Sequence, residues 1–302
     1  MQHRMLGKNG PEVSAIGLGA WPIGGGMGIL EEKVSIATVR TAIDSGITLL
    51  DTAQAYRTSE GTLGKALRDG YRERCFLATK VSRKYSPADI EAAIENSLRS
   101  LNVEFVDLYQ IHGWNAEYPV EESMEAMVKL RDQGKVKYIG VSNYNAEQMQ
   151  RAYDVAPIQS NQPRYNMFDR RIEAEDLAYC DRMGVGVLPH SPLGKGLLTG
   201  KYSADSVFPE DDERSRFPRF QGDLFAGYCA VTDRLKAIAE EKGINMVQLA
   251  VAWLLRRSEV SCVLVGAKNP DQLKDHVAAV DVTFSEEELR RIDQILEATP
   301  KE

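Results

Sequence analysis

Short apolar runs alternate with longer amphipathic segments along almost the whole chain. The apolar runs have strand length and begin near residues 16, 47, 76, 106, 136, 157, 185 and 261. Between them, apolar residues recur at helical spacing and predict helices over about 31–45, 59–69, 87–101, 121–133, 145–153, 172–183, 245–258 and 269–279. Eight strand–helix units without a linker rich in Pro, Gly or Ser predict an α/β fold, a (β/α)₈ TIM barrel forming a single domain over residues 1–302, rather than two doubly wound halves.

Three segments fall outside this alternation. A turn at Gly7–Pro11 between short apolar runs predicts an N-terminal β-hairpin that caps one end of the domain. Two extra helices are predicted over about 229–242 and 285–297, the second opened by Ser285 and an acidic first turn.

The segment from His190 to about Tyr228 shows no sustained period and includes a charged run, Glu210–Arg216. A connection this long inside a compact domain is usually functional or disordered. Because it follows a predicted barrel strand, we expect it to fold over a ligand. A solvated surface excursion is the alternative.

Composition narrows the class of protein. The hydrophobic fraction is 43%, and no apolar run reaches the length of a membrane span, so a soluble protein is expected. No apolar stretch of the signal-peptide kind follows Met1, which favours a cytoplasmic location. The four cysteines have no paired spacing and are expected to be reduced. A net charge of −7 argues against a nucleic-acid partner. The oligomeric state is left open, and a monomer is compatible with the sequence.

Ionisable side chains stand at the ends of successive predicted strands. Asp51 ends the second strand and Tyr56 follows on its loop, while Lys80 and His112 follow the third and fourth strands. Each alone has a bland explanation: Asp51 with Lys80 could be a structural ion pair, and a backbone carbonyl could satisfy His112. Barrel enzymes, however, build their sites from several strand ends on one face.

This set of residues suits proton transfer to or from an oxygen bonded to carbon. A tyrosine hydroxyl titrates near 10, and a neighbouring ammonium such as Lys80 would lower its pKa toward the range of an efficient acid. Asp51 would hold the lysine in place, and His112 would hydrogen-bond the substrate oxygen. The sequence shows no nucleophile–base pair of the Ser–His kind, and its four scattered histidines do not predict a metal site.

The motifs around these residues resemble those of the aldo-keto reductases, NADP-dependent barrel oxidoreductases. They occur in the family's order and cover Asp51–Tyr56, Leu77–Lys80, Val106–His112 and Gly134–Asn143. The resemblance implies that Tyr56 is the general acid in the reduction of aldehydes or ketones, that Lys80 and Asp51 tune it, and that His112 orients the carbonyl. The hydride would come from the nicotinamide of NADPH.

The resemblance also implies a set of cofactor-binding positions. The nicotinamide carboxamide would meet Ser142, Asn143 and Gln162, and the nicotinamide ring would stack on His190. The pyrophosphate would lie along Ser191, Leu193 and Gly196. The adenosine end would be held by Gly266, Lys268, Gln272 and Asp275. A helix predicted to begin near Asn269 would add its positive end to Lys268 at a 2′-phosphate, so NADPH is expected to be preferred to NADH.

The chain departs from the family pattern at two positions. His190 stands where an aromatic ring usually stacks on the nicotinamide, and His276 stands where an asparagine commonly meets the adenine. Trp21 and Trp114 lie on predicted catalytic-face loops and could line an apolar substrate pocket, although simple packing is equally compatible. The cluster Gly24–Gly28 lacks the spacing of a dinucleotide fingerprint.

Two other classes of function stay open. Some members of the family, the potassium-channel β subunits, act mainly as cofactor-sensing partners and keep the same four catalytic-type residues. A barrel isomerase or hydrolase without nicotinamide is a further class, but it would leave the matches at Ser142, Asn143 and Lys268 unexplained. The substrate is expected to be a small carbonyl compound.

Overall fold

Eight parallel strands form the centre of the protein. The computed structural model describes residues 1–210 and 212–301. The sheet order is β10-β3-β4-β5-β6-β7-β8-β9, and all seven pairings within it are parallel. The strands are β3 (Ile16–Gly19), β4 (Leu49–Asp51), β5 (Phe76–Val81), β6 (Val106–Ile111), β7 (Val136–Ser142), β8 (Ser160–Gln162), β9 (Gly186–Val187) and β10 (Val263–Val265).

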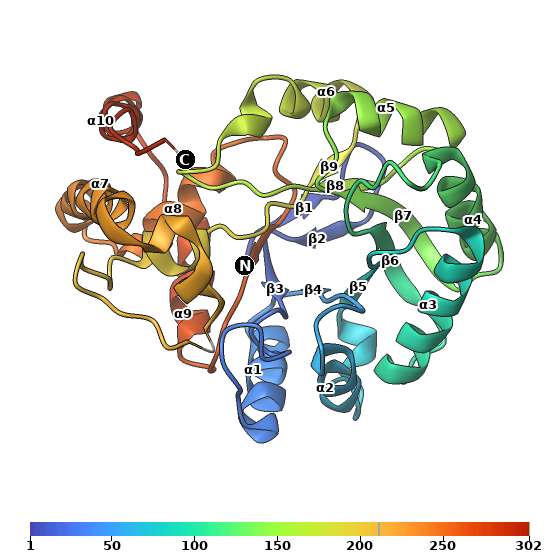
Figure 1. Ribbon diagram of the computed structural model, residues 1–302. Coiled ribbons are helices and arrows are strands. Elements are labelled where there is room, and N and C mark those ends of the chain that lie inside the picture. Colours follow the sequence, from blue (N-terminus) through green and yellow to red (C-terminus); the bar gives the residue numbers. More distant parts are fainter. Residues whose placement is uncertain (211, 302) are drawn as a thin grey trace.

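Hydrogen bonds between the two ends of this sheet close it into a ring. Val187 of β9 forms a parallel bridge with Val260, just before β10. The amide of Ser261 donates to the carbonyl of Val187 at 2.9 Å, and that of Leu264 donates to Pro189 at 3.0 Å. The ring of strands, with helices outside it, confirms the predicted TIM barrel (Figure 1).

The helices follow the strands as the hydrophobic period predicts. Their bounds are α1 (Glu32–Asp44), α2 (Ser59–Ala66), α3 (Pro87–Leu101), α4 (Val120–Asp132), α5 (Ala146–Val155), α6 (Asp176–Met183), α7 (Gly222–Glu241), α8 (Met246–Leu255), α9 (Gln272–Ala278) and α10 (Glu286–Leu296). The two extra helices are α7 and α10. None of the described helices combines the length and the apolarity that crossing a bilayer requires.

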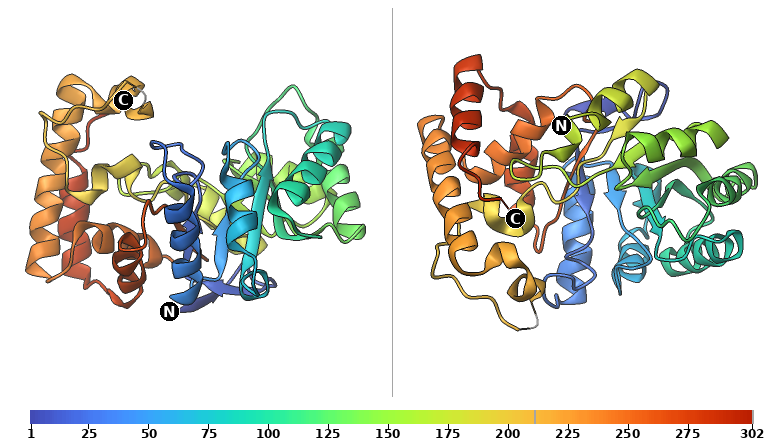
Figure 2. Two further views of the ribbon diagram at one scale, coloured as in Figure 1. Left: turned by 90° about the horizontal axis from the view of Figure 1, so that it is seen from below. Right: turned by 45° about the horizontal axis from the view of Figure 1, so that its top comes forward.

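The N-terminal hairpin closes one end of the barrel. Its strands β1 (His3–Met5) and β2 (Glu12–Ser14) pair antiparallel. Leu6 and Val13 are fully buried and pack with Leu49, Leu108 and Leu264 in the same cluster. The hairpin lies at the bottom of the left view of Figure 2, and the C-terminus lies at the top. The carboxyl ends of the strands are therefore left for a site.

The connection after His190 differs from its prediction. It contains the 3₁₀ helices η3 (Gly194–Thr199), η4 (Glu213–Arg216) and η5 (Pro218–Phe220), and α7 begins at Gly222 rather than near 229. Its aromatic residues make a small core of their own, in which Phe220 and Phe225 are buried beside Leu197. This part of the segment is therefore packed, unlike the solvated surface excursion that the sequence left as an alternative. Asp211, part of the predicted charged run, and Glu302 lie outside the described residues.

Candidate active site

The four strand-end residues converge at the carboxyl end of the barrel. Lys80 Nζ lies 2.6 Å from Asp51 Oδ1 and 3.5 Å from the Tyr56 hydroxyl. The rings of Tyr56 and His112 meet edge to face with their centroids 5.5 Å apart. Asp51 ends β4, Lys80 lies in β5, and His112 directly follows β6, so parallel register brings together residues up to 61 positions apart.

Lys80 and Asp51 form a fully buried ion pair with its hydrogen bonds satisfied. Neither side chain is more than 3% exposed. Lys80 Nζ also donates to the carbonyl of Thr52 at 2.8 Å, and Asp51 Oδ2 accepts from Gln162 at 2.8 Å and Gln110 at 3.4 Å. A buried pair persists only when its remaining donors and acceptors are occupied. Burial alone would lower the pKa of Lys80, but Asp51 and Tyr56 overcome it and hold that pKa above its usual value.

The pKa of Tyr56 is shifted in the direction opposite to that expected from the sequence. Burial is the largest influence and raises it above 10, Lys80 lowers it, and Asp51 raises it. Asp51 thus opposes the effect of its ammonium partner on the pKa of Tyr56, and burial outweighs that ammonium. The expectation of a net lowered pKa is wrong for this structure, and Tyr56 is a protonated phenol at neutral pH.

His112 is held as a neutral imidazole. Burial, followed by the charge of Lys80 and the proximity of His190, lowers its pKa to about 3. Its Nδ1 lies 2.8 Å from the hydroxyl of Ser82. A neutral imidazole offers one N–H donor, so His112 can hydrogen-bond an oxygen placed beside Tyr56 without carrying a charge.

The loop that carries Tyr56 is fixed by contacts that the sequence reasoning missed. Thr52 donates its hydroxyl to Ser59 at 2.8 Å, and Ser59 donates to the carbonyl of Ala20 at 3.2 Å. A Cβ on Gly24 would overlap the carbonyl oxygen of Tyr56, so only glycine fits this approach of the two loops. In the sequence, the only sign of this contact is Ser59 at the start of a predicted helix. Its hydroxyl joins two loops and does not cap the helix.

The residues predicted to meet a nicotinamide carboxamide lie next to this centre. Ser142 donates to the carbonyl of Gln162 at 2.8 Å, and Asn143 Nδ2 donates to Ser142 Oγ at 3.0 Å. Asn143 Oδ1 lies 2.9 Å from His190 Nε2, and His190 Nδ1 lies 3.0 Å from Ser191 Oγ. The structure therefore brings these predicted positions into one chain of contacts.

Backbone conformation marks the same region. Asn143, Ser191 and Lys195 have left-handed φ angles of 58°, 56° and 55°. Such angles are uncommon outside glycine and cluster at functional sites. Leu193 and Gly196 lie in the same segment, in which the amides of Gly194 and Gly196 donate to the carbonyls of Ser191 and Leu193 at 2.9 and 2.8 Å.

The predicted adenosine-end residues lie around the β10–α9 connection. Gly266 packs against Pro22, and Lys268 Nζ donates to the carbonyl of Met27. Burial is the largest influence on Lys268 and lowers its pKa, and the nearby charges of Arg214 and Lys201 lower it further. Several cations therefore share this corner of the protein.

The helix expected near Asn269 begins three residues later, at Gln272, and has seven residues. Gln272 Oε1 instead accepts from the backbone amide of Lys268 at 2.8 Å, and Asp275 accepts from Asn245 at 2.8 Å. The helix-dipole argument for a phosphate at Asn269 is wrong, which leaves the cationic side chains to supply the attraction.

The two tryptophans take different positions. The Trp21 ring lies 5.0 Å from that of Tyr56, edge to face, and its Nε1 donates to Glu213 at 3.4 Å. Trp114 packs edge to face on Tyr144 with centroids 5.3 Å apart. Trp21 therefore walls the catalytic centre, whereas the contacts of Trp114 are those of packing.

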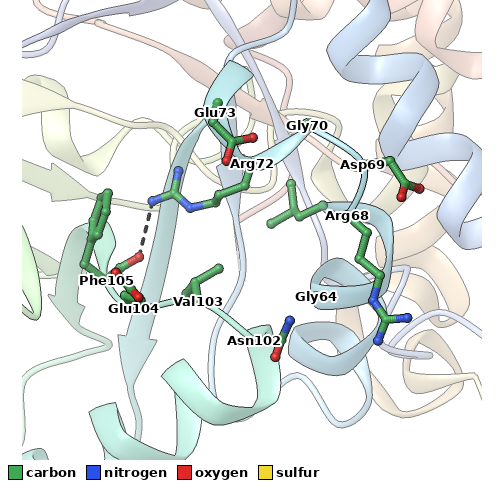
Figure 3. A pocket seen from close by; sticks show the side chains of 11 residues that line it. Gly64, Arg68, Asp69, Gly70, Arg72, Glu73, Asn102, Val103, Glu104 and Phe105 are labelled. Carbon is green, nitrogen blue, oxygen red and sulfur yellow. Dashed lines mark hydrogen bonds between the residues drawn. The ribbon is translucent and has the colours of Figure 1, made fainter.

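Two cavities stand out. One of about 370 Å³ lies at the amino ends of β5 and β6, among Arg68, Arg72, Asn102 and Glu104 (Figure 3). Neither Tyr56 nor any of its three partners lines it. The other, of about 320 Å³, lies at the carboxyl end and includes Ser191 and Lys195. No three His, Cys, Asp or Glu side chains within residues 1–210 and 212–301 form a metal-binding group.

A barrel with a tyrosine–lysine–aspartate–histidine centre at its carboxyl end defines a class of acid–base enzymes that act on oxygen-bearing carbon. Comparison with known proteins identifies the family. The model of the Aldo/keto reductase family matches residues 15–297. The chain belongs to the aldo-keto reductase family, and it is an oxidoreductase.

Known relatives match over nearly the whole chain. Aldo-keto reductase YhdN of Bacillus subtilis (strain 168) is 39% identical, covering 99% of this chain and 95% of the relative. Probable aldo-keto reductase 1 of Glycine max is 33% identical, covering 98% and 88%. Among solved structures, the glycerol dehydrogenase AKR11B4 from Gluconobacter oxydans superimposes with a TM-score of 0.89 at 36% identity, covering 97% and 94%.

Proposed function

We propose that this protein reduces small aldehydes or ketones to alcohols with NADPH, and that Tyr56 is the proton donor. The observation that carries the proposal is the contact of the Tyr56 hydroxyl with a buried, charged Lys80 that is itself held by Asp51. This arrangement gives a phenol that is protonated at neutral pH and a cation beside it to stabilise the phenolate formed when the proton leaves.

The residues present fit a nicotinamide dinucleotide. Asn143, Ser191 and Lys195 hold strained left-handed backbone beside the catalytic centre. At the far end, His276 is 3% exposed and its Nδ1 has no hydrogen-bond partner among the described residues, which leaves a buried polar atom for an adenine or its bound water. Bound NADPH would supply the hydride.

In the proposed reaction, His112 donates its neutral N–H to the carbonyl oxygen and sets its position beside the Tyr56 hydroxyl. Tyr56 then gives its proton to that oxygen as negative charge develops on it. Lys80 stabilises the resulting phenolate, and Asp51 keeps the ammonium charged and aimed at the tyrosine. Trp21 packs on the outer side of Tyr56 and limits its access to water.

The charge at the β10–α9 connection supports NADPH over NADH. A 2′-phosphate carries up to two negative charges. Lys268 stands where the positive charges of Arg214 and Lys201 also act. Arg214 is already paired with Asp212 in two contacts, whereas Lys268 donates to the carbonyl of Met27 and has no ion pair within residues 1–210 and 212–301, so its charge is available to a phosphate.

Tyr56→Phe tests the proposal because it removes the hydroxyl and keeps the ring that packs on Trp21. We expect turnover of NADPH with a generic aldehyde to fall about 10²- to 10⁴-fold, as for other lost proton donors. NADPH affinity, measured by fluorescence titration, should change little. Near-normal turnover by the variant would refute the assignment of Tyr56.

A further inference from the structure

The register between two barrel strands brings Ser82 next to His112. β5 and β6 pair in parallel with Val81 opposite Ile111. The next residue on each chain is then Ser82 opposite His112, and the amide of His112 donates to the carbonyl of Val81 at 3.1 Å. Side chains alternate along a strand, which places Ser82 on the face of β5 that carries Lys80. Ser82 therefore lies at the edge of the candidate active site.

The Ser82 hydroxyl contacts one of the two nitrogens of the His112 ring. Its Oγ lies 2.8 Å from His112 Nδ1. The other nitrogen, Nε2, makes no hydrogen bond with residues 1–210 and 212–301, and the side chain is partly exposed. Nε2 is therefore the nitrogen of this imidazole that is left for the oxygen of a substrate.

The contact with Ser82 bears on which nitrogen carries the proton. Burial and then the charge of Lys80 lower the pKa of His112 to about 3, so its imidazole is neutral at neutral pH and has a single N–H. If Nδ1 carries the proton, it donates to Ser82 and Nε2 is a bare acceptor. If Nε2 carries the proton, Nδ1 accepts from the Ser82 hydroxyl. Which arrangement holds is set by the partner of Nδ1.

The surroundings of Ser82 favour a proton on Nε2. Within residues 1–210 and 212–301 the hydroxyl has no acceptor other than Nδ1, so donation to Nδ1 is the hydrogen bond in which its own proton is used. The opposite arrangement would leave that proton without a partner in this part of the chain. It would also turn a bare Nε2 toward a carbonyl oxygen, and two acceptors cannot form a hydrogen bond.

We propose that Ser82 is a positioning residue, which donates its hydroxyl to Nδ1 of His112 and so keeps the proton of that imidazole on Nε2, where it can meet the carbonyl oxygen. The inference rests on the proposed carbonyl reduction and adds to it a residue that acts through His112. A donor that is fixed before the substrate arrives needs no reorganisation when charge develops on the oxygen.

NMR of the imidazole nitrogens in the full chain tests the position of the proton without any ligand, because a protonated and a bare nitrogen differ strongly in chemical shift. The chain has four histidines, and the signals of His112 are those lost in His112→Gln. At neutral pH the wild type should show a protonated Nε2 and a bare Nδ1. Ser82→Ala should show a mixture of the two forms, and Ser82→Thr, which keeps the hydroxyl, should resemble the wild type. A protonated Nδ1 in the wild type, or an unchanged spectrum in Ser82→Ala, would overturn the inference.

Steady-state kinetics test the consequence for the reaction. Ser82→Ala should lower kcat/KM for a generic aldehyde about three- to tenfold, as loss of one hydrogen bond predicts, and change the NADPH dissociation constant by less than about twofold. Ser82→Thr should recover most of the lost kcat/KM, because it restores the donor. Equal losses in the alanine and threonine variants, or weaker NADPH binding by both, would overturn the inference and leave Ser82 a structural role.

The two experiments separate the inference from the function on which it rests. Normal turnover by Ser82→Ala with a mixture of the two forms of His112 would overturn the positioning role and leave carbonyl reduction standing. If the wild type oxidised NADPH with no aldehyde, the proposed carbonyl reduction itself would fail. The NMR spectra of the wild type and Ser82→Ala would then still decide whether Ser82 keeps the proton on Nε2.

Discussion

At the scale of single residues, the catalytic centre keeps the Tyr56 hydroxyl protonated. Burial raises the pKa of Tyr56, and Lys80 places a positive charge beside the hydroxyl while Asp51 balances that charge. A phenol with a raised pKa is protonated throughout the neutral range, as an acid in carbonyl reduction must be. The ammonium acts at the next stage, because it stabilises the phenolate that proton transfer creates.

Lys80→Met should therefore reduce turnover about as much as loss of the hydroxyl, by about 10²-fold or more. Without the ammonium, burial and Asp51 both raise the pKa of Tyr56, so the pH profile of any residual alcohol oxidation should move to higher pH. Circular dichroism serves as the folding control, since Asp51 keeps its bonds from Gln162 and Gln110. An unchanged pH profile in a folded variant would show that Lys80 does not act on Tyr56.

Lys268→Ala should weaken NADPH about ten- to a hundredfold and NADH much less. The lysine–phosphate contact is charge-assisted but partly open to solvent, so the effect should shrink as salt rises. Dissociation constants for both cofactors at two ionic strengths measure this. Lys274→Ala is the matched control, because Lys274 is an exposed lysine of α9 that pairs with Asp271 at the surface. Equal losses for NADPH and NADH would mean that Lys268 does not read the 2′-phosphate.

At the scale of elements, the sequence predicted the strands and the residues at their ends because both depend on local pattern and on parallel order. Asp51, Lys80 and His112 had to meet once β4, β5 and β6 were neighbours. Other features depend on contacts between distant segments. The amides that complete the bonding of Asp51 come from Gln110 of β6 and Gln162 of the more distant β8, and no local pattern marks them as its partners.

The small aromatic core of the segment after β9 could not be predicted from the sequence pattern. Its aromatic residues, among them Tyr202, Phe208, Phe220 and Phe225, stand at irregular intervals and produce no helical or strand period. In the fold they stack edge to face, with Phe208 5.1 to 5.8 Å from the other three rings. Such a cluster is satisfied by turns and 3₁₀ helices, so periodicity cannot reveal it.

Limited trypsin digestion should cleave this segment at only some of its lysines and arginines. Arg214 is 7% exposed and Lys195 is paired with Glu213, so the first cuts should follow the exposed Lys201 and Arg216. NADPH should slow both cuts, because a bound cofactor adds contacts to the segment that Ser191 begins. Cleavage after the exposed Lys8 of the hairpin should be unaffected by cofactor. Equal rates with and without NADPH at Lys201 and Arg216 would contradict the expectation that this segment folds over a ligand.

At the scale of the whole molecule, the N-terminal hairpin closes one end of the barrel and the candidate active site lies at the other. We propose that residues 1–302 fold as one domain, because the extra helices are tied to the ring and to each other. Lys242, next to α7, pairs with Glu288 of α10 at 2.6 Å, and Arg170 pairs with Asp293 of α10 at 2.7 Å. A domain that folds as a unit should lose stability as a unit when buried groups are forced to ionise.

Buried neutral histidines make that stability depend on pH. Burial lowers the pKa values of His112 and His190 to about 3 and of His276 to about 4. In the unfolded chain a histidine titrates near 6.5. Below about pH 6.5 the unfolded chain therefore binds protons that the folded protein does not, so the free energy of unfolding must fall as the pH falls. For His276 this window closes near its folded value, about 4.

His276→Asn should flatten this dependence, because asparagine keeps a polar side chain of similar size but does not titrate. Each such histidine contributes a slope of up to about 1.4 kcal/mol per pH unit within its window. Urea unfolding of the wild type at several pH values between about 6.5 and 4 should show falling stability, and the variant should lose one histidine's share of the slope. His3→Asn in the exposed first strand is the control. A variant with the wild-type slope would show that His276 is not held neutral by burial, and that the acid sensitivity of the fold arises at the other two sites.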